Sequence, residues 1–116
     1  MRSCLVVAIV ALSGGAALAD AAFNPEFYRF LKDRGLEEQA FNYAVTWAGS
    51  ADGEAETAVA YALLDGVGVE ANPRAAIEIA CRSASMDDFD VGVILVQGNL
   101  RLASKDFRPI RCEGNE

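Results

Sequence analysis

The sequence predicts an all-α fold in which about five short helices stack in two layers. Five segments carry apolar residues at the helical spacing of three and four, and breaks that contain glycine or proline separate them. Residues 59–66 align with 91–98 at an offset of 32, and positions 44–52 match 80–88 at an offset of 36. Repeats of this length are typical of helical hairpins that stack side by side.

The first two helices are predicted from their starts and their apolar faces. Residues 24–26 combine an N-cap asparagine, a proline at the first helical position and an acid, and this helix is expected to end at Gly35. The second helix is expected over about 36–48, and residues 49–53 end it and cap the next one. The apolar faces carry Phe27, Phe30 and Leu31 in the first helix and Ala40, Tyr43, Ala44 and Trp47 in the second.

The third and fourth helices flank a glycine-containing break at 65–71. The third is expected over about 54–64, and the fourth runs from Pro73 to about Ser85. Asn72 and Pro73 repeat the cap-and-proline start of the first helix. The residues expected to face inward are Ala55, Ala58, Val59, Ala62 and Leu63, followed by Ala76, Ile77, Ala80, Cys81 and Ala84.

The fifth segment is compatible with two kinds of secondary structure. Asp87 or Asp88 is a suitable cap for a helix that ends near Gly98, with Val91, Ile94 and Leu95 inside. The β-branched run 91–96 would also suit a strand. Its place in the repeat favours the helix.

The N-terminus is typical of a cleaved secretory signal peptide, predicted to span residues 1–19. One positive charge at Arg2 precedes an uncharged stretch, and Ala17-Leu18-Ala19 offers the small-residue pattern of a cleavage site. A retained membrane anchor is the alternative, but a bilayer span needs about 20 apolar residues. This run is shorter and interrupted by Gly14 and Gly15. We therefore expect a periplasmic or secreted protein with no stable membrane anchor after cleavage.

Cleavage would change the charge and the cysteine count of the chain. Removing 19 of the 116 residues leaves 97, enough for one domain with a modest core. Arg2 is lost while all 17 acids remain, so the net charge falls from −7 to −8. Such a charge argues against nucleic-acid binding and against adhesion to anionic membranes.

Two cysteines, Cys81 and Cys112, remain once Cys4 is removed with the signal. In an exported protein, an even pair most simply forms one disulfide, and two free thiols are the alternative if the compartment is reducing. The disulfide would close a loop of about 30 residues, which is expected to stabilise the fold by about 3–4 kcal/mol. The disulfide would pin a C-terminal tail, residues 103–116, to the fourth helix.

No metal site, cofactor or catalytic machinery is expected. The chain has no histidine, the commonest general base and metal ligand. Three acidic groups, 37–38, 54–56 and 87–90, lie at predicted helix starts. They are suited to binding a cation or a basic partner, but stabilisation of the helix dipole accounts for them more simply. A carboxylate-dependent secreted enzyme remains an alternative function.

Residues 61–76 resemble a Sel1-like repeat, a relative of the tetratricopeptide repeat. The resemblance is specific over about 55–85, one full unit, and partial in the flanking segments. It implies a short right-handed solenoid of helical hairpins over residues 20–102, and a scaffold that holds another protein in its concave groove. The family motif is structural, so it assigns no catalytic residue. The matching residues are Gly66, Gly68 and Val69 in the turn, Asn72 as the cap, and Arg74 and Ala75 opening the second helix.

Possible partner-binding residues are aromatic. Tyr43, Trp47 and Tyr61 are the candidates, together with Phe27 and Phe41, because aromatic anchors often dominate interfaces. Packing in the core is the alternative for each, since an alanine-rich stack needs large side chains to fill space.

The end of the chain, from Asn99 onwards, is basic in an otherwise acidic sequence and has two interpretations. Arg101, Lys105, Arg108 and Arg111 form either a docking strip or part of a cap that closes the open end of the helical stack, and the cap is preferred.

The sequence therefore predicts an exported, non-catalytic protein–protein interaction module. A periplasmic accessory or regulatory subunit is the form that we expect. A small structural subunit or inhibitor of an envelope complex is the alternative, and an exposed aromatic patch without a groove would indicate it.

Overall fold

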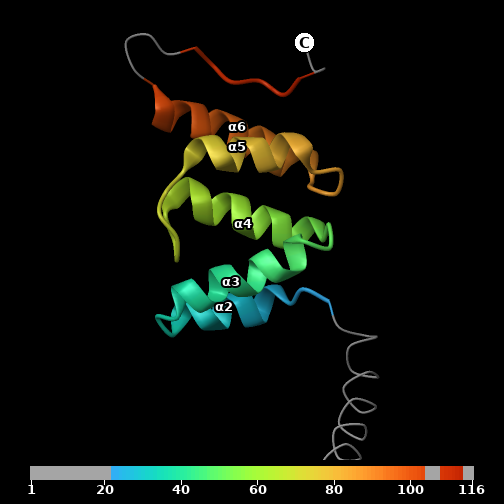
Figure 1. Cartoon of the computed structure of the whole chain (residues 1–116), viewed down its shortest axis with the longest axis vertical. Helices are drawn as coiled ribbons and strands as arrows, with labels where there is room; N and C mark the ends of the chain where they lie inside the picture. The colour runs from blue at the N-terminus through green and yellow to red at the C-terminus, as the bar shows by residue number, and fades with distance from the viewer. Residues whose placement is uncertain (1–21, 104–107, 114–116) are drawn as a thin grey trace, which may run out of the picture.

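The computed structural model describes residues 22–103 and 108–113. Within these ranges the protein is all-helical, with five helices and no strand, which confirms the predicted fold class. The predicted signal peptide, residues 1–19, lies outside the described ranges. The helices are α2 (Pro25–Asp33), α3 (Glu37–Ala48), α4 (Gly53–Asp65), α5 (Pro73–Arg82) and α6 (Asp88–Leu102), as Figure 1 shows.

The helices form a stack in chain order. Each helix packs against the next one along the chain, and α4 also contacts α6. In Figure 1, α2 and α3 lie at one end of the stack, α4 lies in the middle, and α5 and α6 lie at the other end. This arrangement is consistent with a short run of helical hairpins. No helix in the described part is long and apolar enough to span a bilayer.

Side-chain caps begin three of the helices where the sequence predicts them. The amide oxygen of Asn24 accepts hydrogen bonds from the backbone N–H groups of Glu26 and Phe27 at 2.9 and 3.1 Å. Asp52 and Asn72 cap α4 and α5 in the same way, at 3.0 and 3.1 Å. These bonds satisfy backbone donors that have no partner inside the helix.

Alanines dominate the core and set the close spacing of the helices. Small side chains allow neighbouring helices to approach closely, and the larger residues fill the space around them. One cluster lies between α4, α5 and α6 and contains Ala60, Leu64, Ala76, Ala80, Met86 and Ile94. A second cluster lies between α3, α4 and the segment before α2 and contains Phe23, Ala44, Ala55 and Val59.

The turn between α4 and α5 depends on two glycines. Gly66 and Gly68 have φ angles of 77° and 78°, a left-handed conformation that favours glycine. A Cβ atom on Gly68 would also overlap the backbone carbonyl of Glu37 at the start of α3. The backbone conformation therefore requires glycine at both positions, and at Gly68 the close contact with the Glu37 backbone requires it as well.

Helix α5 ends earlier than predicted, at Arg82 instead of Ser85. The Ser83 hydroxyl oxygen accepts hydrogen bonds from the backbone N–H groups of Ser85 and Met86, at 3.2 and 2.9 Å. The same hydroxyl donates to the Glu56 carboxylate on α4. These bonds stabilise a turn in place of a further helical turn, so Ala84 is exposed and not inward as predicted.

Helix α6 ends later than predicted, because Gly98 lies inside it. Gly98 is buried, and a Cβ atom there would lie 2.8 Å from side-chain carbons of Ile77. The glycine permits close packing of α6 on α5 and does not end the helix. The helix continues for another turn, to Leu102.

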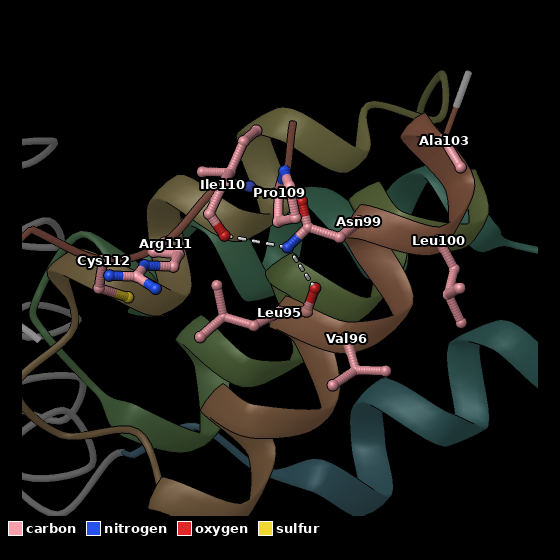
Figure 2. A pocket seen from close by; sticks show the side chains of 9 residues that line it. All are labelled: Leu95, Val96, Asn99, Leu100, Ala103, Pro109, Ile110, Arg111 and Cys112. Atoms are coloured by element: carbon pink, nitrogen blue, oxygen red, sulfur yellow. Dashed lines mark hydrogen bonds between the residues drawn. The ribbon is translucent and has the colours of Figure 1, made fainter. Parts of the chain in front are cut away.

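The described part of the tail lies along α6. Cys112 forms a disulfide with Cys81 of α5, as the sequence predicts. The Asn99 side chain forms two hydrogen bonds with the backbone of Ile110. Its amide oxygen accepts from the Ile110 N–H at 2.8 Å, and its amide nitrogen donates to the Ile110 carbonyl at 3.0 Å. Figure 2 shows Asn99 between α6 and the tail, where it also donates to the carbonyl of Leu95.

Candidate partner-binding groove

A groove runs across the face formed by α2, α4 and α6. It consists of two hollows of about 360 and 280 Å³ that share Tyr28, Lys32 and Ala58. We call this surface the α2–α4–α6 groove. The first hollow extends towards Phe23, Pro25, Arg29, Glu54, Thr57 and Asp90, and the second towards Tyr61, Ala62, Asp65 and Val67.

The two sides of the groove carry opposite charge. Arg29 and Lys32 lie on α2, whereas Glu54, Asp65 and Asp90 lie on α4 and α6. The Lys32 ammonium group is 4.8 Å from the centre of the Tyr28 ring, a cation–π distance. Small or aromatic side chains separate the two charged walls, so a ligand would meet a basic wall and an acidic wall across a largely uncharged floor.

Two tyrosines form part of the floor, and both have raised pKa values. Partial burial raises the pKa of Tyr28, with a smaller contribution from the Glu37 carboxylate. The Tyr61 hydroxyl donates a hydrogen bond to Asp90 at 3.0 Å. Partial burial, that hydrogen bond and the negative charge of Asp90 together raise the pKa of Tyr61 to about 12. The bond joins α4 to α6 on the acidic side of the groove.

The Tyr61 pKa predicts how stability depends on alkaline pH. In the unfolded chain this phenol ionises near its ordinary value of 10.0, whereas in the folded protein it keeps its proton until about pH 12. The folded state therefore binds more protons than the unfolded state in this window, and its stability falls as pH rises from 10 to about 12. Spectrophotometric titration should show one phenol ionising near pH 12 that is missing in Tyr61→Phe. Persistence of that ionisation in the variant would contradict the assignment.

The structure separates the three aromatic residues that the sequence proposed for partner binding. Tyr61 lines the α2–α4–α6 groove, and it also packs against the core cluster between α4, α5 and α6. Tyr43 stacks on Phe23 at a centroid distance of 5.4 Å, and its hydroxyl accepts a hydrogen bond from the Asn24 N–H at 2.9 Å. Trp47 packs against the core cluster that contains Phe23 and Ala44. Tyr43 and Trp47 thus pack within the N-terminal half, while Tyr61 faces the groove.

Of the two further aromatic candidates, only one is exposed. Phe41 packs against the same cluster as Trp47. Phe27 is 43% exposed, and its ring lies 6.2 Å from that of the equally exposed Phe30. The Arg34 guanidinium lies over the Phe30 ring at 4.6 Å. Together they form a small aromatic patch on α2.

Sequence reasoning missed most of the charged residues of the groove. Arg29 and Lys32 are three residues apart on one helix, which places them on one face with Tyr28 beside them. That spacing was the available signal. Asp90 belongs to the acidic group 87–90 that the sequence offered for a basic partner, but its hydrogen bond with Tyr61 on another helix could not be predicted.

The acidic groups identified in the sequence lie in the first turns of their helices. Glu37 and Glu38 are in the first turn of α3, Glu54 and Glu56 in that of α4, and Asp88 and Asp90 in that of α6. Among the described residues, no three His, Cys, Asp or Glu side chains gather closely enough to hold a metal ion. Negative charge at a helix start stabilises the helix dipole.

Comparison with protein-family models, curated proteins and solved structures finds no match to this chain. The resemblance of residues 55–85 to a Sel1-like repeat therefore stays a prediction. Gly66, Gly68 and Asn72 have the conformations that such a turn requires, but other helical hairpins use the same local chemistry. The function is accordingly inferred from the groove.

Proposed function

We propose that the protein is an exported, non-catalytic interaction module that binds a segment of another protein in the α2–α4–α6 groove. It would act as a periplasmic accessory or regulatory subunit. The observation that carries this proposal is the facing pair of charged walls across a tyrosine-containing floor. Complementary charges orient a partner, and an aromatic floor supplies contact area at low entropic cost.

The groove defines the chemistry of the partner segment. Acidic side chains would lie against Arg29 and Lys32, and basic side chains against the wall that contains Glu54 and Asp90, since Asp65 already pairs with Arg101. An apolar side chain between them would contact Tyr61. Such a segment has its charges split between its two edges, with an apolar residue at the centre.

Two further observations support export. The first 19 residues have the pattern of a secretory signal. The Cys81–Cys112 disulfide is of the kind that persists in oxidising compartments. The proposed Sel1-like repeat would agree with a scaffold, because such solenoids present concave surfaces to other proteins.

Capture of the partner from the native envelope tests the proposal. The tagged protein is cross-linked in its own cells, and the yield of a stoichiometric partner is compared between the wild type and Arg29→Glu/Lys32→Glu. Because the variant reverses one wall of the groove, we expect its yield to fall by about tenfold or more.

The matched control is Arg74→Glu/Arg82→Glu. It makes the same charge change at two exposed positions on α5 that do not line the groove. It should capture as much partner as the wild type. Absence of a stoichiometric partner, or equal yields from the groove variant and the control, would overturn the proposal. So would turnover of a substrate that is abolished by replacing Glu54 or Asp90.

A second candidate function uses the aromatic patch on α2. A small structural subunit or inhibitor of an envelope complex would present Phe27 and Phe30, which are exposed side by side, directly to its target. Capture that depends on these two phenylalanines, and not on Arg29 and Lys32, would favour this alternative.

A further inference from the structure

An apolar stripe is exposed along the outer face of α6. Phe89, Val93, Val96 and Leu100 follow one another at spacings of four, three and four residues, which places them in one line on the helix. Phe89, Val96 and Leu100 are 73%, 59% and 64% exposed. We call these four residues the α6 stripe. Beside it, the space next to Gly92 is open, because no side chain or other segment of the described chain lies within 4 Å of where a Cβ would be.

Shallow hollows flank both ends of the α6 stripe. One of about 440 Å³ lies at Phe89 and Val93, and another of about 500 Å³ lies between Leu100 and the tail. In Figure 2 the tail residues Pro109 and Ile110 run beside Asn99, while the side chains of Val96 and Leu100 extend away from them. The described part of the tail, residues 108–113, therefore lies beside one side of α6, away from Val96 and Leu100.

The internal repeat indicates that a helix fits on this face. At the offset of 32, Gly92 and Val96 of α6 correspond to Ala60 and Leu64 of α4. Ala60 and Leu64 are 0% and 2% exposed, and they belong to the cluster that α4 forms with α5 and α6. In the described part of the chain no helix follows α6, so the equivalent surface of α6 stays open.

The α6 stripe is symmetric about its own midpoint, between Ile94 and Leu95. An antiparallel copy of α6 would place Phe89 opposite Leu100 and Val93 opposite Val96, so the same contacts form twice. Such an arrangement pairs large side chains at the two ends with valines at the centre. The open space beside Gly92 leaves room for the second helix to approach closely.

Charge also favours an antiparallel copy. Asp87 and Asp88 lie at the start of α6, whereas Arg101 lies in its last turn. Reversal of the second helix places the acidic start of each α6 beside the basic end of the other. Arg101 already donates to Asp65 at 2.8 Å and to the Gln97 side chain at 2.9 Å, but its side chain stays 39% exposed and is accessible to an acid of the second copy.

We propose that a second copy of this chain covers the α6 stripe, in a two-fold dimer with antiparallel α6 helices. A 15-residue helix is about 22 Å long, so this contact lies at the small end of specific interfaces. A dissociation constant on the order of 10 µM is expected. The dimer does not depend on the proposed function, because the stripe residues do not line the α2–α4–α6 groove.

Sedimentation equilibrium tests the dimer in the purified protein alone, without a partner. The full-length chain is expressed with its own N-terminal segment, purified in the processed form that the host yields, and measured up to about 200 µM. The wild type should dimerise. Val96→Asp should raise the dissociation constant by about 100-fold or more, because it buries two uncompensated carboxylates at the centre of the interface.

Val45→Asp is the matched control, since Val45 is an exposed valine on α3. It should dimerise like the wild type, and circular dichroism of both variants should show the wild-type helix content. A wild type that stays monomeric at the highest concentration overturns the proposal. So does a dimer that Val96→Asp leaves intact, because that dimer would use another face.

Cross-linking tests the antiparallel register. Phe89→Cys and Leu100→Cys are prepared separately and treated with a short bis-maleimide, alone and as an equimolar mixture. An antiparallel pair brings these positions together only between the two variants, so the mixture should cross-link and each variant alone should not. Efficient cross-linking of Phe89→Cys with itself would overturn the arrangement.

Discussion

Removal of the Cys81–Cys112 disulfide is expected to lower the free energy of unfolding by about 3 kcal/mol. The bond joins residues 31 apart and therefore restricts the unfolded chain, while in the folded protein it fixes the tail beside α6. Urea unfolding of Cys81→Ala/Cys112→Ala against the wild type measures the difference. For one small domain this is a large share of the total stability.

Reduction provides the control for this effect. A reducing agent should destabilise the wild type by a similar amount and leave the double variant unchanged, because the variant has no bond to break. The backbone amide of Ile110 should also exchange faster once the tail is released, although Asn99 still contacts it. A loss of less than about 0.5 kcal/mol would show that the disulfide does not stabilise the fold.

Replacement of Gly68 by alanine is expected to cost about 3 kcal/mol. Two effects add at this position. The φ angle of 78° is unfavourable for a residue with a Cβ, and the new Cβ would overlap the Glu37 carbonyl, so the α4–α5 turn and the start of α3 must move apart. Thermal or urea unfolding measures the loss.

Two other glycines separate these effects. Gly35 has a φ of 79° but open space around its missing Cβ, so Gly35→Ala should cost only about 1 kcal/mol. Gly92 is an exposed helical glycine with open space, and Gly92→Ala should stabilise the protein by about 0.5–1 kcal/mol. If Gly68→Ala lowers the free energy of unfolding by no more than Gly35→Ala does, the close contact with the Glu37 backbone does not contribute to the loss.

The sequence predicted those parts of the fold that local chemistry decides. The asparagine caps at Asn24 and Asn72 and the positive φ angles at Gly66 and Gly68 follow from the residues themselves. The ends of α5 and α6 were predicted wrongly because neighbouring helices decide them. In the sequence Gly98 resembles a residue that ends a helix. In the structure it lies inside α6, where its missing side chain leaves room for Ile77.

The groove was harder to predict than the fold. Its walls come from α2, α4 and α6, so Arg29 and Asp90 line the same hollow although they are far apart in the sequence. Tyr61 was proposed because it is aromatic. Tyr61 and Trp47 both pack against a core cluster, and only the arrangement of the helices places Tyr61 in the groove as well. The exposure of the α6 stripe could not be predicted. An apolar helix face predicts burial, but the pattern does not tell whether this chain supplies the helix that covers it.

A map of backbone amide shifts tests the proposed function most directly, when the captured partner, or its cross-linked segment, is added to the isotope-labelled protein. If the proposed function is correct, the largest changes occur at the floor and walls of the α2–α4–α6 groove, in particular at Tyr28, Ala58 and Tyr61. Changes centred on α3 and α5, or on the Phe27 and Phe30 patch with the groove unaffected, would contradict it.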